Sequence, residues 1–155
     1  MRRAAMMAFL TCLALLLVPA AGEGQKEKVF RNISGKHLET ILKEMDISFK
    51  KIPGKKDGIF FYDFERGKLK LRLHNYQGSD LWIDAIFPKV SLENINAWNQ
   101  KTRFSRAVLF KDDDRDSTSL EAQLDCVGGV TEGMIRRFIS RFEEDVQAFS
   151  KYAKK

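Results

Sequence analysis

Cysteine and histidine are scarce in this 155-residue chain, which has two of each. Cys12 lies in an apolar N-terminal run, so the rest of the chain has only Cys126 and cannot form an internal disulfide. That excludes a disulfide-stapled fold, and the domain must rest on its hydrophobic core. His37 and His74 lie in different segments, and neither belongs to a metal-ligand spacing or a nucleophile motif. We therefore expect no metal, no cofactor, no catalytic residues and no enzymatic activity.

A strong excess of one charge is also absent. Residues 23–155 hold 25 basic and 21 acidic side chains, a net charge of +4 that is spread along the chain. Proteins that bind nucleic acids usually cluster their basic residues on one face. We therefore expect no nucleic-acid partner.

The first 22 residues, MRRAAMMAFLTCLALLLVPAAG, have a different composition from the rest. Two arginines precede an apolar run from Ala4 to Val18, and small residues follow at positions 20–22. This layout predicts a secretory signal peptide over residues 1–22, cleaved after Ala20 or Gly22. The run is shorter than the roughly 20 apolar residues that span a bilayer, so we expect membrane contact only before cleavage. An uncleaved membrane anchor is the alternative.

Three segments predict helices, and their starts share the same local signals. Ser34, Ser91 and Thr131 can each cap the free N–H groups of a first helical turn. Each is followed by apolar residues at spacings of three and four, which form one helical stripe. An apolar residue before each cap can also contact one five positions later, as a hydrophobic staple. The staple pairs are Ile33 with Leu38, Val90 with Ile95, and Val130 with Ile135.

The segments between these helices predict strands. Residues 68–74 and 119–126 alternate strictly between apolar and polar, which indicates a sheet with one buried face. Mixed strands are expected over 47–52, 58–64, 80–87 and 104–111. Short connections favour antiparallel pairing, with the helices packed on one face. The sequence thus predicts one α+β domain over residues 31–153, in the order α-β-β-β(-β)-α-β-β-α, after a polar tether over 23–30.

The second half of the chain contains a series of motifs in a characteristic order. The motifs are Trp98-Asn99 at a helix end, Arg103-Phe104 in a basic and aromatic joint, Ala107-Val108 in a strand, an acidic turn over 112–116, the alternating strand over 120–124, Gly128-Gly129, and Thr131-Glu132 at a helix start. This order resembles the YbjN domain family of bacteria. The resemblance extends over residues 35–150.

The resemblance implies a bacterial regulator of sensory transduction with a fold similar to type III secretion chaperones. Those chaperones are α+β dimers that bind unstructured protein segments, so the resemblance implies a homodimer with a protein or peptide partner. They act in the cytoplasm, whereas the signal peptide predicts a periplasmic or secreted protein. We therefore expect a binding or regulatory role in the cell envelope.

Two other functions stay open. Twelve phenylalanines could line an apolar pocket between sheet and helices, as in a carrier of small ligands or lipids, or could simply fill the core. An enzyme whose site is built from scattered Asp and Glu residues is the third hypothesis.

The candidate binding surface combines a basic stripe with the helix–strand joint. Its residues are Lys68, Lys70, Arg72, His74, Trp98 and Arg103. The first four alternate along one strand and could hold an anionic partner, or form a solvated face balanced by Asp80 and Asp84. Trp98 also fits core packing, and Arg103 suits the negative end of the helix dipole.

Two further features have structural interpretations. Asp112, Asp114 and Asp116 have the first spacings of an EF-hand loop, but Ser117 and Gln123 stand where the loop needs Gly and Glu. This segment therefore predicts an acidic hairpin turn and no calcium site. Cys126 falls on the core side of its strand, which indicates a buried, unreactive thiol.

Overall fold

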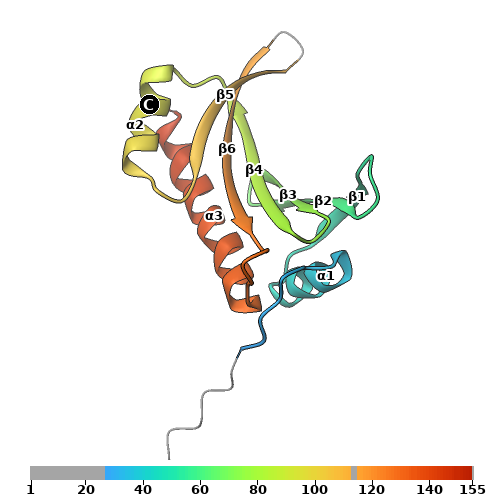
Figure 1. Ribbon diagram of the computed structural model, residues 1–155. Helices are drawn as coiled ribbons and strands as arrows, with labels where there is room; N and C mark the ends of the chain where they lie inside the picture. Colours follow the sequence, from blue (N-terminus) through green and yellow to red (C-terminus); the bar gives the residue numbers. More distant parts are fainter. Residues whose placement is uncertain (1–26, 113–114, 155) are drawn as a thin grey trace, which may run out of the picture.

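The protein is described by a computed structural model covering residues 27–112 and 115–154 (Figure 1). The helices are α1 (Gly35–Glu44), α2 (Leu92–Lys101) and α3 (Glu132–Tyr152). The strands are β1 (Phe49–Pro53), β2 (Ile59–Arg66), β3 (Leu69–Tyr76), β4 (Asp80–Pro88), β5 (Arg106–Asp112) and β6 (Arg115–Asp125). The predicted α+β order is confirmed, with four strands between the first two helices. The predicted signal peptide lies outside the described residues.

The six strands form one antiparallel sheet in the order β1-β2-β3-β4-β6-β5. Hairpins connect the first four strands in sequence. The connection through α2 then carries the chain past one strand position, so that β5 forms the edge and β6 inserts between β5 and β4. β6 is the longest strand and pairs with β4 along nine residues.

All three helices begin where their local signals predict. The cap oxygen of each accepts a backbone N–H three residues on: Ser34 from His37, Ser91 from Asn94, and Thr131 from Met134. The six staple residues are all buried. The starts are predictable because every interaction that defines them lies within a few residues along the chain.

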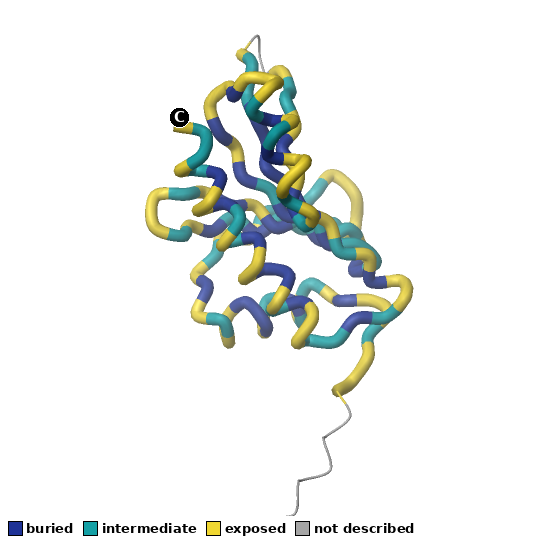
Figure 2. Tube along the Cα trace, turned by 90° about the vertical axis from the view of Figure 1, so that its left-hand side faces the viewer, coloured by how far each residue is buried: buried dark blue, intermediate teal, exposed yellow. Residues whose placement is uncertain are grey.

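The core lies between one face of the sheet and the three helices. Alternate residues of β3 and β4, such as Leu71, Leu73 and Ile83, are at most 2% exposed. Aromatic rings join sheet and helix directly, since Phe87 of β4 meets Phe149 of α3 edge to face with 5.0 Å between ring centroids. Figure 2 shows buried and exposed residues alternating along the helices and strands. The other face of the sheet points away from the helices, and we call it the open face.

The strand boundaries differ from the sequence prediction by at most two residues, apart from the start of the last strand, and two of the differences have a clear physical cause. The first strand begins at Phe49 because Asp46 turns the chain with φ 56° and the Ile47 N–H still bonds to the Leu42 carbonyl. The last strand begins at Arg115, four residues before the predicted start. This arm pairs with β5 through polar residues, and its first two residues have β5 as their strand partner while Ser117 and Thr118 pair with β4 as well, so no apolar alternation marks its start.

Candidate functional site

One line of charged residues crosses the open face from edge to edge, and we call it the ionic row. Each member is the register partner of the next, across all six strands. In spatial order the members are Lys50, Asp63, Arg72, Asp84, Glu121 and Arg106. Four of the five neighbouring pairs join opposite charges, which stabilises a sheet. The fifth pair, Asp84 and Glu121, is acidic on both sides, and these carboxylates contact His74 and Arg106 instead.

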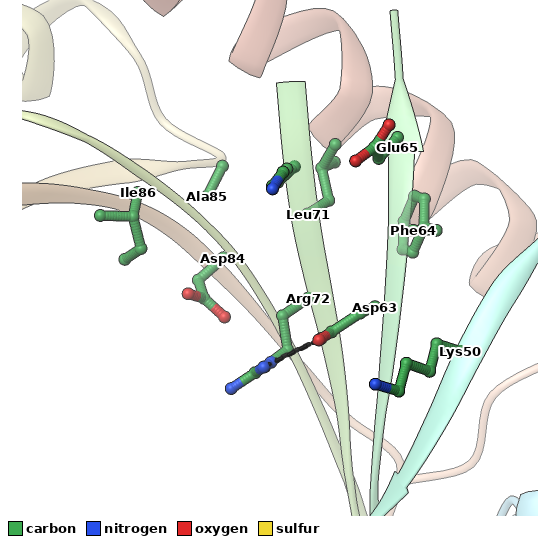
Figure 3. A pocket seen from close by; sticks show the side chains of 10 residues that line it. Lys50, Asp63, Phe64, Glu65, Leu71, Arg72, Asp84, Ala85 and Ile86 are labelled. Carbon is green, nitrogen blue, oxygen red and sulfur yellow. Dashed lines mark hydrogen bonds and ion pairs between the residues drawn. The ribbon is translucent and has the colours of Figure 1, made fainter. Parts of the chain in front are cut away.

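Short bonds fix the centre of the ionic row. The Arg72 guanidinium donates to both carboxylate oxygens of Asp63, at 2.6 and 2.8 Å. This hydrogen bond holds the pKa of Asp63 below its usual value. Figure 3 shows Arg72 reaching toward Asp63, with Lys50 and Asp84 lining the same groove of about 580 Å³. At the far end, Arg106 Nε donates to the nearly buried Glu121 at 2.6 Å.

Beside the ionic row lies an aromatic cluster of Phe61, His74, Tyr76 and Trp82. The His74 ring stacks on Trp82 with centroids 5.1 Å apart and on Tyr76 at 5.9 Å, while Phe61 meets it edge on at 5.0 Å. The Nε2 atom of His74 lies 2.6 Å from the Asp84 carboxylate, which joins the cluster to the ionic row. Burial, followed by the charges of Asp80 and Asp84, raises the pKa of Tyr76. The result is a partly exposed aromatic surface.

A second groove, of about 320 Å³, extends this surface toward the edge of the sheet. Trp82, Arg106 and Gln123 line it from the open face, and the connection over 102–105 forms its wall. Arg103 belongs to that connection and is exposed. The groove therefore links the helix–strand joint to the aromatic cluster.

The structure brings four of the six predicted surface residues to this region. Lys70, Arg72 and His74 share the open face of β3, as the alternation predicts, and Arg103 lines the second groove. Lys68 lies in the turn between β2 and β3 and belongs neither to the ionic row nor to the aromatic cluster. Two members of the basic stripe also contact acidic side chains, since Arg72 pairs with Asp63 and His74 with Asp84.

Trp98 requires a correction, since it lies on the other side of the sheet. It is 8% exposed, and its ring packs against Phe149 at 5.0 Å and Tyr152 at 5.7 Å. Its neighbour Asn99 has a structural role, because its side-chain amide accepts the Ala107 N–H and donates to the Ala107 carbonyl. This part of the joint is thus a connection between packed elements, and of the two predicted surface residues in the joint, Trp98 and Arg103, Arg103 is the exposed one.

Sequence reasoning missed most of the aromatic cluster. The members outside β3 are Phe61 and Trp82, which come from β2 and β4. Period-2 alternation in each strand places them on the polar side, but only the register shows that they meet at His74.

The remaining candidates carry no site chemistry. Cys126 is fully buried, and this burial raises the pKa of its thiol to about 11. In the acidic turn, Asp116 pairs with Lys89, while the side chains of Asp112 to Asp114 lie outside the described residues. Within 27–112 and 115–154, no group of His, Cys, Asp or Glu could hold a metal ion. No helix in the same ranges is long and apolar enough to cross a membrane.

Comparison with known proteins identifies relatives of this chain. Residues 75–154 match the sequence profile of the YbjN family, described as "Putative bacterial sensory transduction regulator". The structure is similar to the crystal structure of YbjN from E. coli, described as "a putative transcription regulator", with a TM-score of 0.55 and 16% sequence identity. The similarity covers 72% of this chain and 84% of the other. Among curated proteins, no sequence matches significantly.

Proposed function

Because this chain belongs to the YbjN family, we propose that it is a non-catalytic module that binds a protein or peptide partner in the cell envelope. The family's regulatory description supports a role exercised through binding. The compartment rests on the signal peptide that the sequence predicts. A homodimer is part of the proposal, and a monomer by light scattering across micromolar concentrations would remove that part.

The aromatic cluster on the open face is the observation that carries this proposal. Aromatic residues and arginine are enriched in protein interfaces because they combine apolar area with hydrogen bonding. Here a stacked set of rings lies beside two arginines, on the face that the helices leave uncovered. Ile86 is 55% exposed and Val108 36% exposed on the same face, which adds apolar area.

The case for a carrier of small ligands depended on the number of phenylalanines, and the fold accounts for most of them. Nine phenylalanines lie in the core cluster or pack directly against it. They are Phe30, Phe49, Phe60, Phe64, Phe87, Phe104, Phe138, Phe142 and Phe149. These side chains fill the space between sheet and helices, so phenylalanine content alone no longer indicates a ligand pocket.

The proposal is tested by crosslinking the tagged protein in the envelope of its host and identifying captured proteins by mass spectrometry. We compare the wild type with Trp82→Ser, which removes the ring that joins the aromatic cluster to the second groove. Leu92→Ser is the matched control, because Leu92 is 62% exposed and belongs to α2, which contributes no residue to the aromatic cluster. Circular dichroism checks that both variants fold.

We expect one stoichiometric partner with the wild type and with Leu92→Ser, and at least a tenfold loss of it with Trp82→Ser. Equal capture by Trp82→Ser would rule out the open face as the binding surface. Capture of the protein alone would contradict a separate protein partner and turn attention to self-association.

A further inference from the structure

β6 extends beyond its neighbour β5. Pairing with β4 runs from Ser117 to Asp125 of β6, whereas pairing with β5 ends at Glu121. Among residues 27–112 and 115–154, the segment Ala122–Asp125 therefore has a strand partner on one side only. At about 3.3 Å per residue, this free edge is about 13 Å long.

The backbone groups of the free edge can be assigned from the bonds on either side of it. The N–H and C=O of Ala107 bond to Asn99, so they point away from β6. Successive residues of an antiparallel ladder point in opposite directions, so Arg106 and its partner Glu121 point toward each other. Gln123 lies two residues further along β6, so its N–H and C=O groups point to the same side as those of Glu121.

Gln123 and Asp125 thus direct their N–H and C=O groups to the side from which β5 is missing. An independent bond agrees, because the Cys126 N–H donates at 2.9 Å to the Ser79 carbonyl on the β4 side. Ala122 and Leu124 direct their N–H and C=O groups to the opposite side, toward β4. Within the described part of the chain, the free edge offers unpaired donors and acceptors in the pattern that another strand requires.

The second groove runs along this edge because the chain before β5 is held away from β6. The Phe104 ring packs edge to face on Phe138 of α3 at 5.7 Å. The Ser105 hydroxyl donates to Asp145 of α3 at 2.6 Å. Ala122 and Gln123 line the groove on the β6 side. The space is therefore set by side-chain contacts with α3.

The outer edges of the sheet are less suitable for strand pairing. The edge of β5 is covered at Ala107 by the Asn99 amide. β1 ends in Pro53, which has no N–H, and carries Lys50 and Lys51, which are features that discourage strand addition. The segment Ala122–Asp125 has neither protection.

The charges at the groove favour an acidic partner. Arg106 is paired with Glu121, whereas Arg103 is exposed and has no ion pair among the described residues. The lining therefore carries one uncompensated positive charge. On the other side of the edge, Ala122 and Leu124 face the core side of the sheet, where an apolar residue fits.

We propose that an extended segment of a partner protein adds to β6 along Ala122–Asp125 as an antiparallel strand. Its side chain opposite Gln123 is acidic and faces Arg103, and the two flanking side chains are apolar. Backbone bonds then provide affinity and the side chains provide specificity. This inference rests on the proposed binding function and specifies the conformation and chemistry of the partner.

The test is a nuclear magnetic resonance titration of the ¹⁵N-labelled protein with acetyl-Thr-Val-Asp-Val-Thr-amide. In the free protein, we expect the Gln123 amide to exchange with solvent at least tenfold faster than the Ala122 and Leu124 amides. Adding peptide should shift the Gln123 and Asp125 signals and slow their exchange. A peptide methylated on the aspartate nitrogen, and one with lysine in place of aspartate, should each bind at least tenfold more weakly.

Variants isolate the backbone contribution. Gln123→Pro removes the outward N–H, which β4 does not use, whereas Gln123→Ala removes the side chain and keeps that N–H. We expect Gln123→Pro to lose peptide binding and Gln123→Ala to retain it, with circular dichroism confirming the fold of both. Arg103→Glu should reverse the preference for aspartate over lysine.

Equal binding of the methylated peptide, or no binding of the aspartate peptide to the wild type at millimolar concentration, would overturn strand addition. If Trp82-dependent capture persists in that case, the proposed function stands and only this inference is wrong. If both peptide binding and Trp82-dependent capture are absent, the proposed function is wrong as well.

Discussion

The side-chain amide of Asn99 takes the place of a neighbouring strand at the edge of β5. It makes two hydrogen bonds to Ala107, at 2.8 and 3.0 Å. Replacing it by leucine leaves both backbone groups without their partner, and we expect Asn99→Leu to lower the free energy of unfolding by about 1–3 kcal/mol. Urea denaturation measures this loss. Asn96→Leu is the control on the exposed side of the same helix, and an equal loss there would contradict the role assigned to Asn99.

Trp98 contributes its rings to the core, while its polar atom is unused. Its indole N–H is buried and has no hydrogen-bond partner among the described residues. Trp98→Phe keeps an aromatic ring near Phe149 and removes the unpartnered donor, so we expect stability within about 1 kcal/mol of the wild type. Trp98→Ala should cost about 3–5 kcal/mol, because it leaves a cavity. Thermal denaturation compares the two, and similar losses would show that the N–H is bonded in solution.

At the scale of strands, the ionic row predicts a pH-dependent contribution to stability. Arg72 lowers the pKa of Asp63, so the pair stabilises the fold above the unfolded pKa, about 4, and loses this effect as pH falls through the lower folded pKa. Asp63 is 35% exposed, which limits the effect to about 0.5–1 kcal/mol. We expect Arg72→Gln to lower the free energy of unfolding at pH 7 and to lower it much less at pH 2.

The measurement is urea denaturation of the wild type and the variant at both pH values. Lys50→Gln is the control, since Lys50 neighbours Asp63 across β1 and β2 but forms no ion pair among the described residues. A loss from Arg72→Gln that is the same at pH 2 and pH 7 would assign the role of Arg72 to packing.

Elements were predictable where the signals that define them are local. Ser34 lies next to the helix that it caps, so its role can be read from a few residues. The arm that begins at Arg115 forms a strand because it pairs with β5 and, from Ser117 on, with β4 as well. The candidate surface shows the same limit, because alternation placed Arg72 and His74 on one face, but the stacking of Trp82 on His74 depends on the register of two strands. The position of Arg103 beside Trp82 depends on a crossover that no local pattern reveals.

At the scale of the whole molecule, the two cysteines report on processing and folding together. Cys12 lies in the predicted signal peptide, and Cys126 lies in the core with its pKa raised to about 11 by burial. Only the thiolate reacts with disulfide reagents, so the folded, processed protein should show no reactive thiol at pH 8. After denaturation it should show one, and its N-terminus should be Ala21 or Glu23.

Thiol titration and intact-mass measurement of the protein purified from its host check this prediction. Two thiols after denaturation would mean that Cys12 is retained, which favours the membrane-anchor alternative over export with cleavage. Cys126→Ala provides the control, because the denatured variant should then show no thiol if the signal peptide is removed and one if it is kept. A reactive thiol in the native wild type that Cys126→Ala abolishes would instead contradict the buried position of Cys126 and hence the packing of β6 against the core.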